Sequence, residues 1–179
     1  MAISKRRRHE IIDLAIPGVP PGTPEELWND DKALTPLIRA ADRKRNKWLD
    51  SATDARELHL FAENWHWDGG GGKPLQRLVA NPHCDAGTMM MLFWLGCAED
   101  YYFQYSTIGE IDWEHDREIF RLLRRIERKI VRADYSTARI PFDPTPRIAM
   151  RDRWDEFARA MPEIMTSPIG KRPGGKNRR

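Results

Sequence analysis

The chain has 179 residues, of which 40% are hydrophobic and 32% are charged. This composition is typical of one globular domain and excludes an intrinsically disordered chain. The two cysteines, Cys84 and Cys97, lie in or beside apolar stretches, which argues against a secreted disulfide framework and favours a reducing compartment. The longest apolar run, residues 89–97, is far shorter than the roughly 20 residues that cross a bilayer. We therefore expect a cytoplasmic protein without a membrane span.

The formal net charge of +3 is the sum of segments whose own net charges have opposite signs. Lys5 to Arg8 carry four positive charges, and residues 171–179 carry five. Between Asp54 and Asp116, in contrast, eleven acidic residues stand against three basic ones, a net charge of −8. The basic ends favour nucleic acid as a partner, whereas the acidic block favours a basic protein.

Helix-start signals recur along the chain as Thr-Pro pairs at 23–24, 35–36 and 145–146. Threonine is a good N-cap residue, and proline is tolerated at the first helical position, where its missing N–H costs nothing. The pairs predict a short helix ending near Asp30, a helix from Pro36 to about Asp50, and a last helix carrying Met150 to Met161. The residues before them, 1–22, are predicted to be a basic, proline-rich extension.

The middle of the chain predicts three more helical segments. Leu58, Phe61, Ala62 and Trp65 recur at helical spacing and predict a helix over residues 54–65 that the glycines at 69–72 end. Pro74 then starts a short helix, which Asn81-Pro82 ends. Asp85 is placed to cap a third helix, whose residues 89–95 are apolar on all sides, so it should be the buried centre of the core.

A long amphipathic helix is predicted from about Asp112 to Ala133. Its apolar residues fall on one face, and arginines occupy the rest: Ile119, Leu123, Ile126 and Ile130 against Arg117, Arg121, Arg124, Arg125, Arg128 and Arg132. Glu118 and Glu127 are the expected intrahelical ion-pair partners. The arginines of residues 117–132 and the basic tails also support a second reading, a nucleic-acid-binding accessory protein.

No segment alternates apolar and polar residues, so the fold class is predicted to be all-α. We expect a single helical domain over residues 23–165, built from stacked antiparallel helix pairs in a loosely HEAT-like manner. Residues 166–179 are predicted to be a flexible basic tail.

Catalysis has little support in the sequence. His66-Trp67-Asp68 and His83-Cys84-Asp85 contain residue types that bind metals, which keeps a metal-dependent hydrolase as a further alternative, but their spacing fits no known zinc pattern. The same residues are accounted for as helix caps and turn-packing groups. Gly69 to Lys73 lacks the Ser or Thr of a phosphate loop because Pro74 follows the lysine. We expect no enzyme, no metal and no cofactor.

Several short motifs resemble a bacterial family, the domain-of-unknown-function family 4274. They are Glu57-Leu58-His59, Asn64 to Gly69, Asn81 to Asp85, Gly87-Thr88 and Met91 to Trp94. The family pattern joins a helix, a Trp-Asp-Asp-Gly turn, a short helix, a His-Pro-x-Cys-Asp turn and an apolar helix. This chain departs from it at Gly69, which replaces the second Asp, at His83, which follows the proline, and at Met89-Met90, which replace a small residue and a leucine.

The resemblance implies an immunity protein (antitoxin), since genes of this family are expected to lie beside bacterial toxin genes. Such a protein would bind and occlude a cognate toxin, expected to be basic, for example a nuclease, whose cleft an acidic surface would fill. Aromatic anchors ringed by charge are typical of binding hot spots. The expected contact residues are Trp67, Asp68, Glu99, Asp100, Tyr101, Tyr102, Glu110 and Asp112.

Overall fold

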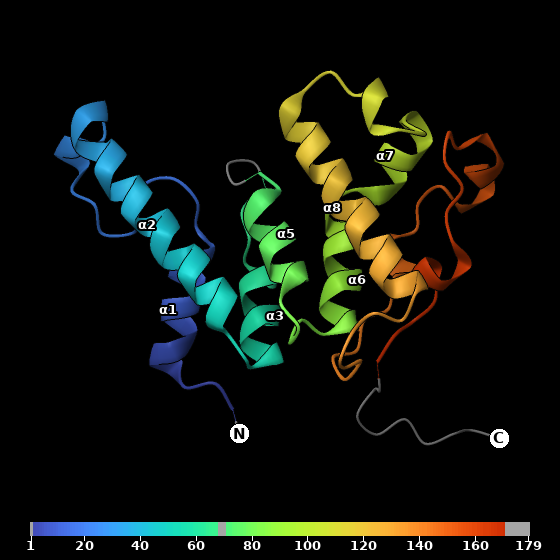
Figure 1. Ribbon diagram of the computed structural model, residues 1–179, viewed down its shortest axis with the longest axis horizontal. Coiled ribbons are helices and arrows are strands. Elements are labelled where there is room, and N and C mark those ends of the chain that lie inside the picture. Colours follow the sequence, from blue (N-terminus) through green and yellow to red (C-terminus); the bar gives the residue numbers. More distant parts are fainter. Residues whose placement is uncertain (1, 68–70, 171–179) are drawn as a thin grey trace.

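Paired helices build the part of the chain that the computed structural model describes, residues 2–67 and 71–170. Successive pairs follow one another: α1 (Lys5–Ala15) with α2 (Asp31–Ser51), α3 (Ala55–Glu63) with α5 (Lys73–Ala80), and α6 (Ala86–Leu95) with α8 (Glu114–Val131). The short α7 (Ala98–Gln104) joins α6 to α8 (Figure 1). The 3-10 helices are η1 (Glu25–Leu27), η2 (Ile108–Glu110), η3 (Thr145–Arg147), η4 (Arg151–Glu156) and η5 (Glu163–Thr166).

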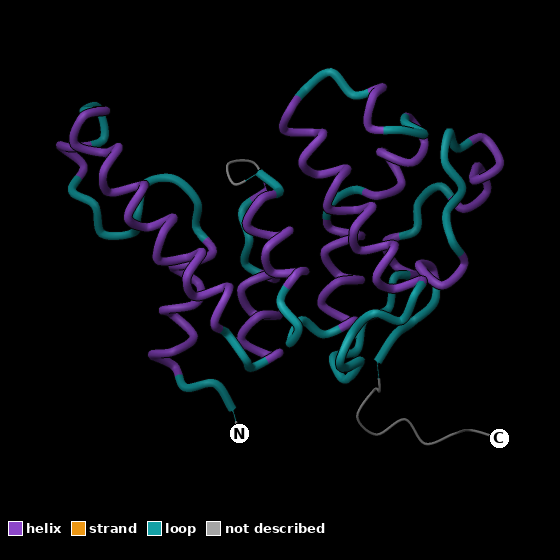
Figure 2. The backbone as a smooth tube through the Cα atoms, viewed as in Figure 1, coloured by secondary structure: helices purple, strands orange, loops and turns teal. Residues whose placement is uncertain are grey.

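The helices form two layers. α1 contacts α3, and α3 contacts α6, while α2 contacts α5, and α5 contacts α8. The members of each pair run antiparallel, and Figures 1 and 2 show the pairs side by side. Within the described residues the chain contains no strand, only one isolated bridge between Phe142 and Ile169. The prediction of an all-α single domain is therefore confirmed.

α6 is the centre of the core, as its composition predicted. Met89, Met90, Leu92 and Phe93 are fully buried, and only Leu95 of this helix retains partial exposure. A helix that is apolar on every side is stable only when other elements surround it. α3 and α8 provide those surroundings.

Aspartate caps fix where the helices begin. Asp85 caps α6, as predicted, and Asp54, the predicted first residue of the preceding helix, caps α3. The start of α2 was predicted wrongly, because Asp30 caps it and Pro36 lies inside the helix. The Asp30 carboxylate accepts hydrogen bonds from the N–H groups of Lys32 and Ala33, at 3.0 and 3.1 Å. One acceptor thus serves two otherwise unpaired donors of the first turn, which stabilises the earlier start.

The N-terminal segment is part of the domain, which corrects the prediction of an extension over residues 1–22. Residues 5–15 form α1, and its Ile11, Leu14 and Ala15 are buried in the core. The buried Arg45 of α2 donates to the carbonyl groups of Leu14 and Ile16, both at 2.7 Å, and so holds the end of α1.

The predicted last helix over residues 150–161 is wrong, since η4 and extended chain occupy that segment. The buried carboxylate of Glu99 accepts hydrogen bonds from Ala149 N, Met150 N and Trp154 Nε1 at 2.8, 3.2 and 3.2 Å. These bonds hold the start of the segment on α7 instead of leaving it to form its own helix. The described chain continues to residue 170, and residues 171–179 of the predicted tail lie outside the described residues.

Candidate functional site

An acidic, aromatic surface lies where α7 leads into α8, at the top of Figure 1. Residues 98–116 contain six acidic residues and no lysine or arginine. Trp113, the residue that precedes α8, has 76% of its surface exposed, and Asp112 and Glu114 flank it. An indole this exposed beside carboxylates has no role in packing the chain. We call Tyr101, Glu110, Asp112, Trp113 and Glu114 the Trp113 surface.

The loop that presents Trp113 is fixed by hydrogen bonds. The Glu110 carboxylate accepts from Ser106 N at 2.8 Å, from Ser106 Oγ at 2.6 Å and from Thr107 Oγ1 at 3.1 Å. These bonds, those from Ser106 first, lower the pKa of Glu110 and keep it ionised. Ile111 is buried, and its carbonyl accepts from Arg117 Nε at 2.6 Å. The indole therefore extends from an ordered support.

Tyr101 joins the two helices of the surface. Its hydroxyl donates to Asp116 Oδ1 at 3.0 Å, which places α7 beside the first turn of α8. Its ring lies 6.4 Å from that of Phe120, centroid to centroid. Burial, and then the Asp116 carboxylate, raise the pKa of Tyr101, so the phenol stays protonated and acts as a hydrogen-bond donor.

The structure divides the predicted contact residues into two groups. Asp100, Glu110 and Asp112 are exposed, and Tyr101 is half-buried. The carboxylates of Asp100 and Asp112 make no hydrogen bond or ion pair within the described part of the chain. These four residues remain candidates.

The other predicted residues do not share this surface. Glu99 and Tyr102 are buried: Glu99 holds residues 149–154, and the Tyr102 hydroxyl donates to Glu127 inside the protein. Trp67 is half-buried against the core, and Asp68 lies outside the described residues. Neither Glu99 nor Tyr102 is therefore free to contact a partner.

Trp113 was missed by the sequence analysis. The signal was present, because this tryptophan falls outside the buried stripe of Ile119, Leu123 and Ile126 and stands between two acidic residues. A large apolar residue in such a place has no core position to fill.

The arginines of α8 are only partly engaged by carboxylates. Arg121 pairs with Glu114 at 2.8 Å, and Arg124 pairs with Glu127, as predicted for an intrahelical partner. Glu118 instead pairs with Lys73 of α5 at 2.8 Å, so its predicted intrahelical role is wrong. The reason is proximity: α5 packs against α8, and Gly72 N also donates to Glu118 Oε2 at 3.3 Å.

Two of the motif residues with metal-binding side chains, Cys84 and Asp85, are buried within the protein. Asp85 is fully buried and caps α6, and burial raises the pKa of the Cys84 thiol. Burial also raises the pKa of Cys97, with Asp100 as a second cause. Among residues 2–67 and 71–170, no three His, Cys, Asp or Glu side chains are grouped so that they could hold a metal ion.

Comparison with known proteins finds a family model that matches part of the chain. Residues 53–131, 79 of the 179 residues, match the family model described as "Domain of unknown function (DUF4274)". No curated protein and no solved structure matches the chain. The family resemblance of the sequence motifs is thus confirmed over the segment from the start of α3 to the end of α8, which contains the Trp113 surface. No described helix has the length and hydropathy needed to cross a membrane.

Proposed function

We propose that the chain is a cytoplasmic immunity protein that binds a basic protein toxin. Residues 53–131 match the DUF4274 family model, whose description assigns no activity. The observation that carries this proposal is Trp113, 76% exposed between Asp112 and Glu114. It is supported by the ordered loop beneath the indole and by the absence of lysine and arginine from residues 98–116.

The energetics of the Trp113 surface suit a binding hot spot. A tryptophan side chain buries roughly 150–250 Å² in an interface, and tryptophan is enriched among residues that dominate binding energy. The surrounding carboxylates attract a basic partner and raise its association rate. A nuclease toxin has a basic active-site cleft, which an indole ringed by carboxylates would fill in place of the phosphate backbone.

The test is co-expression with the product of the adjacent open reading frame. The proposal requires that the chain rescues growth and co-purifies with the toxic product. Trp113→Ala should weaken the isolated complex at least about 30-fold, the equivalent of about 2 kcal/mol. Trp28→Ala is the matched control, since Trp28 is also exposed, at 57%, but lies between η1 and α2. The start of α2 is at the end of the stack opposite to α7 and α8 (Figure 1).

Two results would contradict the proposal. One is a neighbouring product that is neither toxic nor bound by the chain. The other is equal loss of affinity in the Trp113→Ala and Trp28→Ala variants, which would show that the Trp113 surface is not the interface.

A nucleic-acid-binding role is the second candidate, and one observation favours it. Arg121, Arg125, Arg128 and Arg132 recur about one turn apart along the same side of α8. If they bind phosphates, affinity for DNA or RNA falls steeply with salt, and each Arg→Ala variant reduces the salt slope by about one. A gel shift at two salt concentrations separates this role from toxin binding.

A further inference from the structure

A polar cleft at the other end of α8 has no part in the proposed function. It lies between the start of α3, the turn from α5 to α6 and residues 136–140, and has a volume of about 680 Å³. α8 has 18 residues, so about 27 Å of helix separates this cleft from Trp113. The polar side chains that line this cleft include Thr53, Arg56, His83, Ser136 and Arg139.

One wall of the cleft, residues 136–140, is fastened to the buried Asp85. Its Oδ2 accepts from Thr137 Oγ1 at 2.6 Å and from Arg139 N at 2.8 Å, and its Oδ1 accepts from Ile140 N at 3.2 Å. Ser136 Oγ adds a bond to the carbonyl of Pro82 at 2.7 Å. The backbone that carries Arg139 is therefore fixed before any ligand arrives, which lowers the entropic cost of binding.

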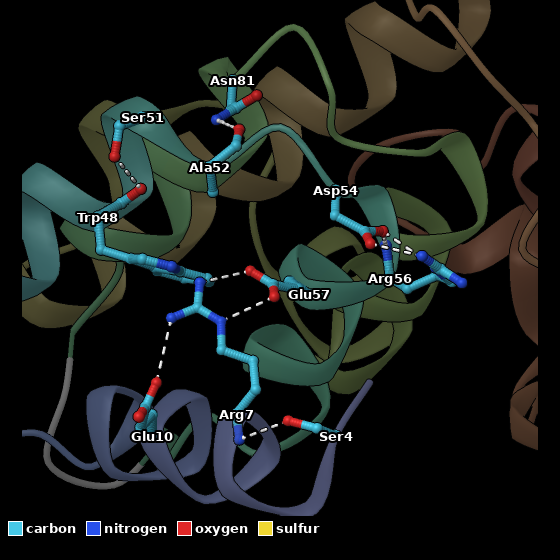
Figure 3. A network of polar contacts seen from close by, with 10 residues as sticks. All are labelled: Ser4, Arg7, Glu10, Trp48, Ser51, Ala52, Asp54, Arg56, Glu57 and Asn81. Atoms are coloured by element: carbon cyan, nitrogen blue, oxygen red, sulfur yellow. Dashed lines mark hydrogen bonds and ion pairs between the residues drawn. The ribbon is translucent and has the colours of Figure 1, made fainter. Parts of the chain in front are cut away.

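The carboxylates at the cleft are already engaged. Asp85 is fully buried, and these bonds and its cap to Gly87 N at 2.9 Å occupy both of its oxygens. Asp54 accepts from Arg56 Nε and Nη2 at 3.0 and 2.6 Å, and Figure 3 shows the guanidinium folded against it. These hydrogen bonds from Arg56 lower the pKa of Asp54. The cleft thus presents little free negative charge.

Two basic side chains remain available to a ligand. Arg139 and His83 are exposed, and neither side chain makes a hydrogen bond or ion pair within the described residues. α3 and α6 also begin at this cleft, so the positive ends of two helix dipoles point to it. The guanidinium of Arg139, the imidazole of His83 and the hydroxyl of Thr53 therefore line the same cleft.

From this arrangement we propose that the cleft binds a phosphate-bearing small molecule. The Arg139 guanidinium has the fork geometry that grips two phosphate oxygens, and His83 and the Thr53 hydroxyl supply further donors. The volume lies in the range of small-molecule sites and accommodates more than a bare anion. The rest of the ligand would lie along the wall of residues 136–140.

Isothermal titration of the full chain at constant ionic strength tests this site with four probes: inorganic phosphate, pyrophosphate, ADP and acetate. The expected result is saturable binding of the phosphate probes, tightest for ADP or pyrophosphate, and none of acetate. ADP binding tighter than pyrophosphate assigns a nucleotide-like ligand, and the reverse order assigns a free polyphosphate.

Arg139→Ala should weaken phosphate binding at least tenfold, and His83→Ala several-fold. Arg147→Ala is the matched control, because Arg147 is an exposed arginine in η3 outside the cleft. All three side chains are exposed, so the melting temperatures should agree, and a variant that fails to fold is replaced by Arg139→Gln. The Trp113→Ala variant should bind the probes normally, which keeps this test separate from the toxin test.

Three outcomes overturn the site: no saturable binding, equal binding of acetate, or equal weakening by Arg147→Ala and Arg139→Ala. The last two would show that the probes respond only to net positive charge.

Discussion

Arg7 donates through Nε and Nη2 to both carboxylate oxygens of Glu57, at 2.7 and 2.6 Å, and so ties α1 to α3 (Figure 3). The carboxylate, through these hydrogen bonds first, raises the pKa of the guanidinium. The bond crosses a boundary in the chain, because Glu57 lies inside the matched family segment and Arg7 lies outside it. The N-terminal helix is therefore attached to the segment that matches the DUF4274 model by a specific, two-point contact.

Arg7→Ala should lower the free energy of unfolding by about 1 kcal/mol, since the pair is bidentate but Arg7 retains 38% side-chain exposure. Urea denaturation measures this. Arg6→Ala is the control, because Arg6 has 92% side-chain exposure and, among the described residues, forms an ion pair only with Glu10 on its own helix. It should change the free energy by less than about 0.5 kcal/mol. Equal effects of the two substitutions would contradict the assigned role of the Arg7–Glu57 pair.

The sequence predicted best where one property decided the outcome. α6 had to be central because it is apolar on all sides, and Asp85 had to cap it because its carboxylate reaches a free N–H group of the first turn. Where two signals competed, prediction failed. The basic run at residues 5–8 suggested an extension, although Ile11, Leu14 and Ala15 follow it at helical spacing. These three residues are buried and pack α1 into the core.

The candidate site was harder to predict than the fold, because exposure depends on tertiary contacts. Glu99 and Tyr102 look like surface residues within an acidic, aromatic segment, yet Glu99 binds backbone N–H groups 50 residues later in the chain. The sequence around Glu99 gives no sign of such long-range partners. Trp113, in contrast, lies outside the apolar stripe of α8, and that position was a usable signal of its exposure.

Asp85→Ala should cost at least about 3 kcal/mol of stability, because it removes the cap of α6 and leaves the N–H groups of Arg139 and Ile140 and the Thr137 hydroxyl without their acceptor. Asp54→Ala removes only a half-exposed cap and should cost about 1 kcal/mol. Thermal unfolding compares the two, and similar losses would show that Asp85 does no more than cap its helix.

Substitutions of two tryptophans, Trp94 and Trp113, should distinguish a role in packing from a role in binding. Trp94 is 5% exposed and donates through Nε1 to the Met165 carbonyl at 2.9 Å, so Trp94→Ala should destabilise by about 3–5 kcal/mol. Trp113→Ala should leave the unfolding free energy within about 0.5 kcal/mol of the wild type. A large destabilisation by Trp113→Ala would mean that the indole packs within the chain and is not a free anchor.

Stability should fall as the pH drops below about 6.5. Desolvation, the largest cause, lowers the pKa of His59, against the opposing influence of Glu63 and Asp85. The unfolded chain therefore takes up a proton at His59 at a higher pH than the folded chain does, and protonation favours unfolding from about 6.5 down to the lowered pKa. Above that window both states are neutral at this residue, and its contribution is constant.

His59→Gln tests this effect, because glutamine can keep a hydrogen bond to Thr88 Oγ1, which lies 3.0 Å from His59 Nδ1, without titrating. Urea midpoints at pH 7.5 and 5.5 should differ less in this variant than in the wild type. A pH dependence that the substitution leaves unchanged would assign the effect to other groups.

The stacking of helix pairs also sets the order in which parts of the molecule open. α1 and α2 have neighbours on one side only, whereas α3 and α6 are enclosed from both directions. In such a nearly one-dimensional array, the end unit detaches at lower free energy than the middle. Amide hydrogens of α6 should exchange with solvent deuterium last, those of α3 earlier, and those of α1 and α2 first. The chain would then lose its N-terminal pair as a unit while residues 53–131, which match the family model, stay folded.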